Sequence, residues 1–507
     1  MKPPMISARL TIDPHFTVGP VRRRVFGSFV EHLGRCVYDG IYEPGHPTAD
    51  EEGLRQDVID LVRELGVSTI RYPGGNFVSG FRWEDSVGPR EERPTRLDLA
   101  WHSTETNAFG LHEFGSFVEK VGGEIMLALN LGTRGTLEAL DLVEYANVRA
   151  GSTLADRRVA NGRTEPFDVR MWCLGNEMDG PWQLGHRSGT DYGKLAAQVA
   201  KALRQLDERV ELVVCGSSNA RMPTFGSWER DVLMEAYDDV DYISCHAYYQ
   251  EHDGDLGSFL ASPVDMDRFI ETVVATADHV KAVKRSEKTI DISFDEWNVW
   301  YQDRYRNVDR IEGIENWPQA PRLLEDAYSV ADAVVVGGLL ISLLKHADRV
   351  TAASLAQLVN VIAPIMTEPG GPAWRQTTFF PFAITSELAL GTALEVKLES
   401  PGYETALYGE VPQLDAVATH DAGTGRTAVF VVNRSQTEEA TVEIDVTGLG
   451  EVAVRSVRTI SDDDVTAANT LADRERVAPR DNGSAVVDGA TLTVTLPPVS
   501  WTAIELS

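Results

Sequence analysis

Residues 124–130 read EIMLALN, and this near-continuous apolar run is the stretch that decides the fold class. A strand covered on both faces has this form, whereas a strand with one face in solvent alternates apolar and polar residues. Residues 137–149 follow with the apolar spacing of a helix that buries one side. The pair therefore predicts one strand-and-helix unit of a parallel sheet.

The same unit recurs along most of the chain. Eight strand candidates lie at residues 25–31, 67–73, 124–130, 169–175, 211–216, 242–247, 291–294 and 350–355. Helical patterns alternate with them at residues 54–65, 111–121, 137–149, 192–206, 228–237, 265–284 and 323–345. Eight such units close a parallel barrel, so we predict an α/β fold with a (β/α)8 TIM barrel at residues 21–385.

The pattern changes after about residue 386. Short alternating strands follow, such as AVFVV at 428–432 and ATVEIDV at 440–446. Alternation indicates strands with one buried face, so residues 386–507 should form an all-β, jelly-roll-like sandwich domain. Residues 1–20 also contain an alternating stretch, and we expect this N-terminal segment to pair with the sandwich.

Charge and composition exclude several classes of partner. The 507 residues carry a formal net charge of -30, which repels nucleic acid phosphates and anionic lipid surfaces. No apolar run approaches the roughly 20 residues that cross a membrane, and the N-terminus lacks the apolar core of a secretory signal. We therefore expect a cytoplasmic protein with a neutral substrate, no nucleic acid partner and no membrane partner.

Two strands of the predicted barrel end in a glutamate. Residues 172–177 (WCLGNE) place Glu177 at the end of the fourth strand, and residues 293–298 (SFDEWN) place Glu296 at the end of the seventh. Barrel enzymes keep their chemistry at this end of the strands. Retaining glycoside hydrolysis needs a carboxylic acid and a carboxylate about 5 Å apart, which such a pair can supply. Either glutamate alone is more typical of a solvated turn, so the joint position carries the prediction.

Five ordered motifs extend this interpretation. They are FGSFVEHLG at 26–34, RYPGGNF at 71–77, WED at 83–85, WCLGNE at 172–177 and DEWN at 295–298. With them the chain resembles, over almost its whole length, the intracellular α-L-arabinofuranosidases of glycoside hydrolase family 51. The resemblance implies a retaining, exo-acting enzyme that removes terminal non-reducing α-L-arabinofuranosyl residues from arabino-oligosaccharides, arabinan or arabinoxylan fragments. It also implies Glu177 as the acid/base and Glu296 as the nucleophile.

The resemblance further implies which side chains bind the sugar. In similar enzymes the matching positions are Glu31, Arg71, Asn76, Asn176, Tyr248 and Gln357. Tyr248 would lie beside the nucleophile, and Gln357 would bind a sugar hydroxyl. An alternative for Glu31 and Arg71 is a structural ion pair near the barrel mouth. If both instead point inward, they offer a hydrogen-bonding cradle for a small polyol.

Histidine and tryptophan residues add further candidates. His246 ends the sixth strand without a second histidine or cysteine at a ligand-like spacing, so we expect a hydrogen-bonding role and no metal. Trp300, like Trp83, Trp101 and Trp297, is either a stacking platform for a sugar ring or core filler. The four cysteines show no C-x-x-C pair and should be buried free thiols. Glycoside cleavage needs no cofactor, and we expect none.

Other functions remain open at this stage. An endo-β-glucanase or a β-xylosidase would use the same barrel and the same two glutamates. A non-catalytic carbohydrate-binding protein would leave both glutamates as bystanders. The set of Glu31, Arg71 and Asn76 favours a furanose in a closed pocket. Similar proteins assemble as homohexamers, so the resemblance also implies a homohexamer.

Overall fold

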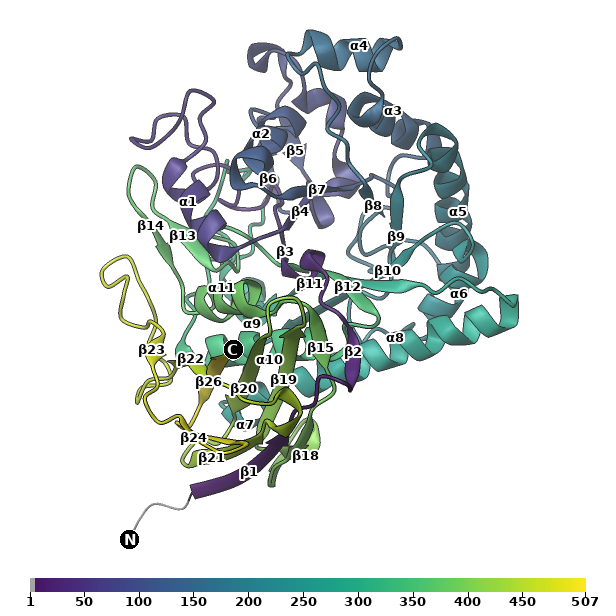
Figure 1. Cartoon of the computed structure of the whole chain (residues 1–507). Coiled ribbons are helices and arrows are strands. Elements are labelled where there is room, and N and C mark those ends of the chain that lie inside the picture. Colours follow the sequence, from purple (N-terminus) through teal and green to yellow (C-terminus); the bar gives the residue numbers. More distant parts are fainter. Residues whose placement is uncertain (1–4) are drawn as a thin grey trace.

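A closed barrel of parallel strands forms the larger part of the molecule (Figure 1). This computed structural model describes residues 5–507, so the first four residues of the predicted N-terminal segment lie outside the described residues. In barrel order the strands are β3 (Gly27–Phe29), β4 (Thr69–Tyr72), β7 (Glu124–Ala128), β8 (Met171–Leu174), β9 (Glu211–Val214), β10 (Tyr242–Tyr249), β11 (Asp291–Val299) and β12 (Val350–Leu355). Each overlaps one predicted strand, and the predicted α/β barrel is confirmed.

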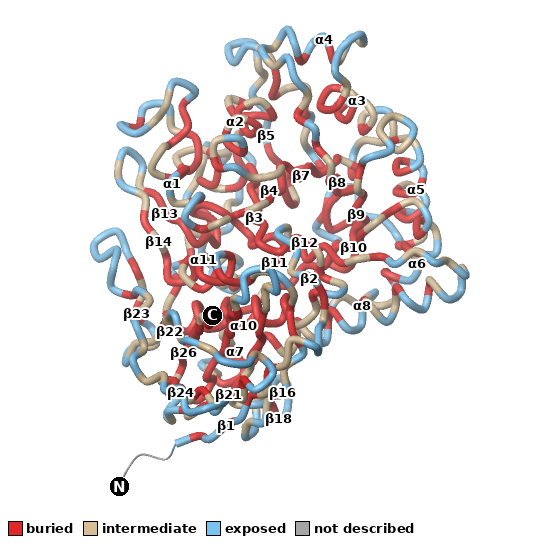
Figure 2. Tube along the Cα trace, viewed as in Figure 1, coloured by how far each residue is buried: buried red, intermediate tan, exposed pale blue. Residues whose placement is uncertain are grey.

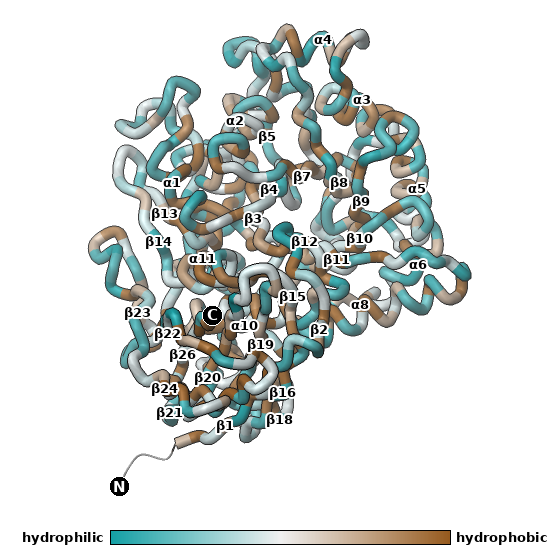
Figure 3. Tube along the Cα trace, viewed as in Figure 1, coloured by the Kyte–Doolittle hydropathy of each residue, from teal (hydrophilic) through white to brown (hydrophobic). Residues whose placement is uncertain are grey.

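Helices surround the barrel and cover the outer face of its strands (Figure 1). The helices of residues 5–507 are α1 (Gln56–Leu65), α2 (Leu111–Val121), α3 (Thr136–Asn147), α4 (Thr153–Ala160), α5 (Gly189–Leu206), α6 (Ser227–Ala236), α7 (Leu256–Leu260), α8 (Pro263–Lys284), α9 (Gln302–Arg304), α10 (Val330–Lys345) and α11 (Phe379–Leu388). Of these, the short α9 lies in the loop after β11 and not in the outer layer. The barrel strands are buried along nearly their whole length (Figure 2). Apolar segments concentrate on the same inner elements, in agreement with their burial (Figure 3). Among residues 5–507, no helix has both the length and the apolar character that crossing a membrane requires.

Two strands extend beyond their predicted ends. β10 continues to Tyr249, and β11 continues through Glu296 to Val299. Pairing between β10 and β11 shifts register between Ser244 and His246, and pairing between β11 and β12 shifts between Phe294 and Trp297. Such irregularities change where side chains point. The sequence prediction ended the strand at residue 294 because the polar residues that follow looked like a turn.

The C-terminal part consists mainly of two sheets packed face to face. One contains β16 (Lys397–Glu399), β1 (Met5–Thr11), β21 (Glu439–Asp445), β25 (Thr491–Leu496) and β24 (Val486–Asp488). The other contains β2 (Thr17–Pro20), β15 (Thr392–Leu394), β19 (Leu414–Asp421), β20 (Arg426–Asn433), β26 (Ser500–Leu506), β22 (Val454–Ile460) and β23 (Arg480–Asp481). Buried side chains from both sheets, including Leu10, Val431 and Ile444, form one apolar core. The N-terminal strand β1 runs parallel to β21, and β2 pairs with β15.

Helix α10 joins the two parts. Every residue from Val330 to Leu344 is buried, as expected for a helix that is apolar on all sides. The predicted helix began near residue 323, but α10 begins at Val330 because the Ser329 side chain caps it, accepting a hydrogen bond from the Asp332 amide. On one side α10 contacts β11 and β12 of the barrel, and on the other it contacts β19, β20 and β26.

Candidate active site

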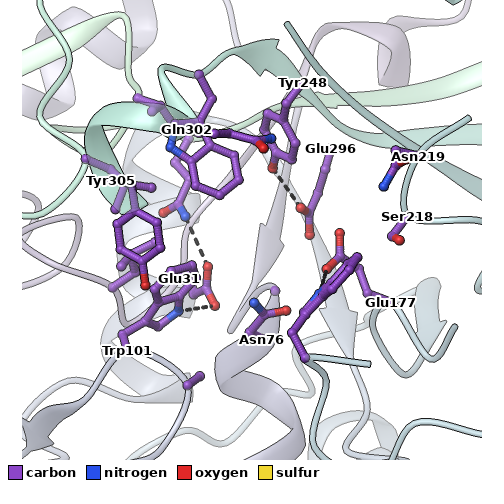
Figure 4. A pocket seen from close by; sticks show the side chains of 18 of the residues that line it. Glu31, Asn76, Trp101, Glu177, Ser218, Asn219, Tyr248, Glu296, Gln302 and Tyr305 are labelled. Carbon is purple, nitrogen blue, oxygen red and sulfur yellow. Dashed lines mark hydrogen bonds between the residues drawn. The ribbon is translucent and has the colours of Figure 1, made fainter. Parts of the chain in front are cut away.

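A cavity of about 820 Å³ opens at the carboxyl ends of the barrel strands. Seven of the predicted site residues line it, namely Glu31, Asn76, Glu177, Tyr248, Glu296, Trp300 and Gln357. Figure 4 shows Glu177 and Glu296 facing each other near the middle of the cavity. The other three predicted residues, Arg71, Asn176 and His246, are buried and make hydrogen bonds among themselves or to the two central glutamates.

The two glutamates converge from β8 and β11, which β9 and β10 separate in the barrel. Glu177 follows β8 and Glu296 lies within β11, yet one oxygen of each carboxylate and one nitrogen of His246 all lie within 4.8 Å of one another. Both side chains are almost enclosed, because Glu177 is 8% exposed and Glu296 is 5% exposed. A separation near 5 Å is the spacing of retaining glycosidases, since inverting enzymes need a wider gap for a water molecule.

Glu296 is held by donors on both of its oxygens. Nη1 of Arg71 donates to Oε1 at 2.8 Å, and the hydroxyl of Tyr248 donates to Oε2 at 2.7 Å. Burial raises the pKa of Glu296 above its ordinary value, against the lowering effects of the charged His246 and Arg71 and of the Tyr248 hydrogen bond. The donors therefore favour the ionised carboxylate in a site where burial alone would favour the neutral acid.

Arg71 links Glu296 to buried residues beneath the cavity. Besides Glu296, it donates through Nη2 to Oδ1 of Asn176 at 2.6 Å, and its Nε lies 3.4 Å from the sulfur of Cys173. Its ion-pair partners are Glu296 and, at 3.8 Å, Asp295. The alternative in which Arg71 forms a structural ion pair with Glu31 is therefore wrong.

His246 bridges the acidic groups. Nδ1 lies 2.9 Å from Oε1 of Glu177 and 3.6 Å from Oε2 of Glu296, while Nε2 lies 2.8 Å from Oδ1 of Asp295. Burial alone would lower the pKa of His246, but the carboxylates of Glu296, Asp295 and Glu177 outweigh burial and raise the pKa well above its ordinary value. Both ring nitrogens therefore face carboxylate oxygens, an arrangement that favours the imidazolium form, in which both nitrogens donate.

The same cluster offers the ligand types of a metal site. Glu177, His246 and Glu296 are close enough together to hold one metal ion. However, both ring nitrogens of His246 already contact carboxylate oxygens, Nδ1 that of Glu177 at 2.9 Å and Nε2 that of Asp295 at 2.8 Å, and a ring that donates from both nitrogens presents no lone pair to a metal. The geometry of His246 fits a hydrogen-bonding role better than a role as a metal ligand.

Glu177 has a second donor that the sequence prediction did not include. Nε1 of Trp182 donates to Oε2 of Glu177 at 2.7 Å. Glu177 has a positive φ of 43° and follows Gly175, whose φ is 97°, so the chain turns sharply where β8 ends. This turn directs the Glu177 carboxylate across the cavity toward Glu296 (Figure 4).

Glu31 anchors the other side of the cavity. Its Oε1 accepts from the Phe77 amide at 2.9 Å and from Nε1 of Trp101 at 2.8 Å, and its Oε2 accepts from Nε2 of Gln357 at 3.1 Å. Burial raises the pKa of Glu31 to about 8, although the hydrogen bonds from Phe77 and Trp101 oppose the shift. Gly75 packs against this carboxylate so closely that a Cβ there would lie 2.9 Å from Oε2.

Several buried polar atoms of the site lack a partner within residues 5–507. They are Nδ2 of Asn176, Oε1 of Gln357 and Nε1 of Trp300. A buried polar group without a hydrogen bond costs free energy, so each is suited to a ligand that supplies the missing partner. Donors and acceptors of this kind fit the hydroxyl groups of a sugar.

The tryptophan candidates divide into two groups. Trp101 and Trp300 line the cavity, whereas Trp297 is fully buried and Trp83 packs against Tyr145 at 4.8 Å. Trp83 and Trp297 are therefore core residues. All four cysteines are buried free thiols, as predicted.

Comparisons with known proteins agree over nearly the whole chain. A family described as the α-L-arabinofuranosidase 1 domain matches residues 61–268, and a family described as the α-L-arabinofuranosidase C-terminal domain matches residues 295–500. A family 51 α-L-arabinofuranosidase of known structure from Bifidobacterium longum is 50% identical, with a TM-score of 0.95 and 99% of both chains covered. The chain belongs to glycoside hydrolase family 51.

Relatives of this family 51 chain are similar over most of their length. An intracellular exo-α-(1→5)-L-arabinofuranosidase of Streptomyces lividans is 60% identical over 504 residues, which cover 99% of this chain and 75% of that protein. An exo-α-(1→6)-L-arabinofuranosidase of Bifidobacterium longum is also 60% identical, over 98% of this chain and 97% of that protein. Family membership confirms the resemblance inferred from the five sequence motifs.

Proposed function

We propose that this family 51 chain is a retaining, exo-acting α-L-arabinofuranosidase that uses Glu296 as nucleophile and Glu177 as acid/base. The observation that carries the proposal is the approach of the two carboxylates to within 4.8 Å across a buried cavity. The activities named for the relatives of the chain support the same substrate class.

The first step forms a covalent intermediate. The Glu296 carboxylate attacks the anomeric carbon of the arabinofuranosyl residue, and the bond from that carbon to the leaving oxygen breaks. Glu177, in its protonated form, donates its proton to the leaving oxygen. Arg71 and Tyr248 hold the Glu296 carboxylate by both oxygens, which orients it for the attack.

The second step releases the sugar. Glu177, now a carboxylate, takes a proton from a water molecule that attacks the same carbon, and the ester bond to Glu296 breaks. Two inversions leave the anomeric configuration unchanged. Because His246 contacts Glu177 and Asp295, it can hold the Glu177 carboxylate in position through both steps.

The side of the cavity at Glu31 supports exo action. Trp101 and Gln357 both donate hydrogen bonds to Glu31. Figure 4 shows Glu31 and Trp101 on one side of the two glutamates, where this group forms a wall. A polymer that continued past the cleaved residue would meet this wall, whereas a terminal furanose would end there. In this proposal Asn76, Asn176 and Gln357 bind its hydroxyl groups, and Trp300 packs near Tyr248 at 5.1 Å.

The proposal also includes the natural substrates, the location in the cell and the assembly of the protein. Short arabinofuranosyl-containing oligosaccharides suit an enzyme of the cytoplasm, and the word intracellular in the relatives' names supports that location. We carry over the homohexamer as a further prediction from the resemblance.

Azide rescue separates the two glutamate roles. Glu296→Ala and Glu177→Ala should each lower turnover of 4-nitrophenyl α-L-arabinofuranoside, the latter less because this leaving group needs little protonation. Azide should rescue Glu177→Ala with an α-configured glycosyl azide, since azide replaces the water of the second step. It should rescue Glu296→Ala with the β-configured azide, since azide then replaces the nucleophile.

The same substrates distinguish the alternatives. Wild-type protein that cleaves an aryl β-D-xyloside or releases oligosaccharides from β-glucan, but leaves the arabinofuranoside intact, would favour the β-xylosidase or endo-β-glucanase. Wild-type protein that cleaves no glycoside would favour a carbohydrate-binding protein. Either outcome contradicts the proposal.

A further inference from the structure

The cavity continues well beyond the two glutamates. In Figure 4, Ser218 and Asn219 lie on the opposite side of Glu177 from Glu31 and Trp101. Further lining residues on the loops after β9 and β10 include Arg221 and His252. The volume of about 820 Å³ is in the range of pockets that enclose a drug-sized ligand, so one five-carbon sugar fills only part of it.

The far end of the cavity includes a residue from the C-terminal part. Tyr408 lines the cavity and lies in the turn between β17 (Gly402–Thr405) and β18 (Gly409–Pro412). Among the described residues 5–507, Tyr408 is the one cavity-lining residue that comes after α11, the last helix of the barrel, along the chain. The β17–β18 hairpin therefore contributes to a wall that the barrel loops otherwise form.

Hydrogen bonds to the barrel hold this hairpin in place. Oγ of Ser258 accepts from the Ala406 amide at 3.1 Å, and the Tyr403 hydroxyl donates to the Gly257 carbonyl at 2.9 Å. Nη2 of Arg268 donates to the carbonyl of Tyr408 at 3.2 Å. The position of Tyr408 is thus set by α7, α8 and the residues between them.

The polar groups at this end are suited to an uncharged ligand rich in hydroxyls. Tyr249 lines the cavity, and its hydroxyl is buried. The Asp265 carboxyl lies near it, and burial raises the pKa of Asp265. With Arg221 and Tyr408 these groups combine aromatic faces with a few fixed donors and acceptors, as specific small-molecule sites do.

The position of the acid/base indicates which part of the substrate this end of the cavity binds. Glu177 protonates the leaving oxygen, so the leaving part of the substrate extends past Glu177, away from Glu31. We infer that the space from Ser218 to Tyr408 binds the sugar residues on the leaving side of the cleaved bond, and that Tyr408 favours oligosaccharides over short glycosides. This inference rests on the proposed function and names the part of the substrate that the C-terminal hairpin recognises.

The test compares two substrates that differ in their leaving part. For each variant, kcat/KM is measured with α-(1→5)-linked arabinotriose and with 4-nitrophenyl α-L-arabinofuranoside, and the ratio of the two values is taken. Tyr408→Ala should lower the ratio about fivefold to tenfold, the loss expected for one aromatic contact. The matched control is Leu407→Ala, the neighbouring residue, which is 51% exposed and does not line the cavity, and its ratio should equal that of the wild type.

Three outcomes would overturn the inference or its basis. A Tyr408→Ala protein with a wild-type melting temperature and an unchanged ratio would exclude a role for the hairpin. A lowered ratio in Leu99→Ala, on another part of the rim, without one in Tyr408→Ala would place the leaving sugars elsewhere. Wild-type protein that cleaves neither substrate would instead refute the proposed function. Tyr408→Phe keeps the aromatic ring, so its ratio of kcat/KM values should stay close to that of the wild type. This variant tests the inference even if Tyr408→Ala misfolds.

Discussion

At the scale of single residues, the ionisation of Glu296 controls reactivity. Only its carboxylate form can attack the anomeric carbon, and burial works against that form. The donors Arg71 and Tyr248 and the imidazolium of His246 oppose burial. The acid limb of the pH profile of kcat/KM should therefore report the protonation of Glu296 in the free enzyme.

Tyr248→Phe tests this balance. Removing the hydroxyl takes away a donor to the ionised form, so the pKa of Glu296 should rise and the acid limb should move to higher pH. A hydrogen bond to a charged group contributes about 1.5–3 kcal/mol, which corresponds to about one to two pH units. The control is Tyr242→Phe, at the other end of β10, where the hydroxyl donates to Glu211. An acid limb that stays in place in Tyr248→Phe would contradict the assignment.

Glu31 should couple folding stability to pH. Its pKa is raised to about 8 in the folded protein, above the value of about 4.3 for an exposed glutamate. The folded state therefore favours the neutral acid, and this contribution to stability is full below about pH 4.3 and is lost as pH rises through 8. Glu31→Gln stays neutral. Relative to the variant, the wild type should lose free energy of unfolding between pH 5 and pH 8, as urea denaturation measures, and a constant difference would refute the shift.

At the scale of elements, the turn after β4 sets the position of Glu31. A Cβ on Gly75 would lie 2.9 Å from Oε2 of Glu31, and that carboxylate is fixed by Phe77, Trp101 and Gln357. A small displacement in such a site is costly, because groups placed about 1 Å away from their productive positions lose much of their effect.

Gly75→Ala should therefore lower kcat/KM for the aryl arabinofuranoside on the order of 10- to 100-fold. Gly45→Ala is a suitable control, because a Cβ at Gly45 meets nothing within 4 Å. Melting temperatures of both variants show whether the fold persists. Wild-type kinetics in a folded Gly75→Ala protein would mean that the turn has no part in positioning Glu31.

The elements also show how far local pattern reaches. Short β-rich runs that alternate with helical patterns predicted all eight barrel strands. Several of these runs, such as residues 124–130, are almost wholly apolar, because strands buried on both faces differ in sequence from exposed segments. The continuation of β11 through Glu296 was missed, because its buried charges are balanced by Arg71 and His246, which come from other strands. The local sequence around β11 does not reveal partners that come from distant parts of the chain.

At the scale of the whole molecule, α10 ties the barrel to the sandwich. Gly337 faces Trp501 of β26, and a Cβ there would lie 2.2 Å from Cδ1 of that ring. Alanine in place of glycine inside a helix normally stabilises by about 1 kcal/mol. Here overpacking at the junction should reverse the sign.

We expect Gly337→Ala to lower the free energy of unfolding by about 1–3 kcal/mol. Thermal or urea unfolding, followed separately by barrel and sandwich probes, measures this loss. If the variant is as stable as the wild type or more so, the close contact between α10 and the sandwich is not a constraint on the fold.

Long-range contacts explain what sequence reasoning missed in the site. The ten predicted site residues meet in one place, since most stand at the ends of strands or in motifs. Trp182 and Asp295 were absent from the prediction because their roles depend on hydrogen bonds to Glu177 and His246, which form only when the turn after β8 is folded and β10 lies beside β11. Tyr408 was absent because only the packing of the C-terminal hairpin brings it there.

The most direct test of the central claim is to trap the glycosyl enzyme. Glu177→Ala lacks the base for the second step, so brief incubation with an aryl α-L-arabinofuranoside should leave one arabinosyl group on the protein. Mass spectrometry of a proteolytic digest should place that group on the peptide that contains Glu296. A label on a different carboxylate, or a first-formed product of inverted configuration from the wild type, would contradict double displacement by this pair.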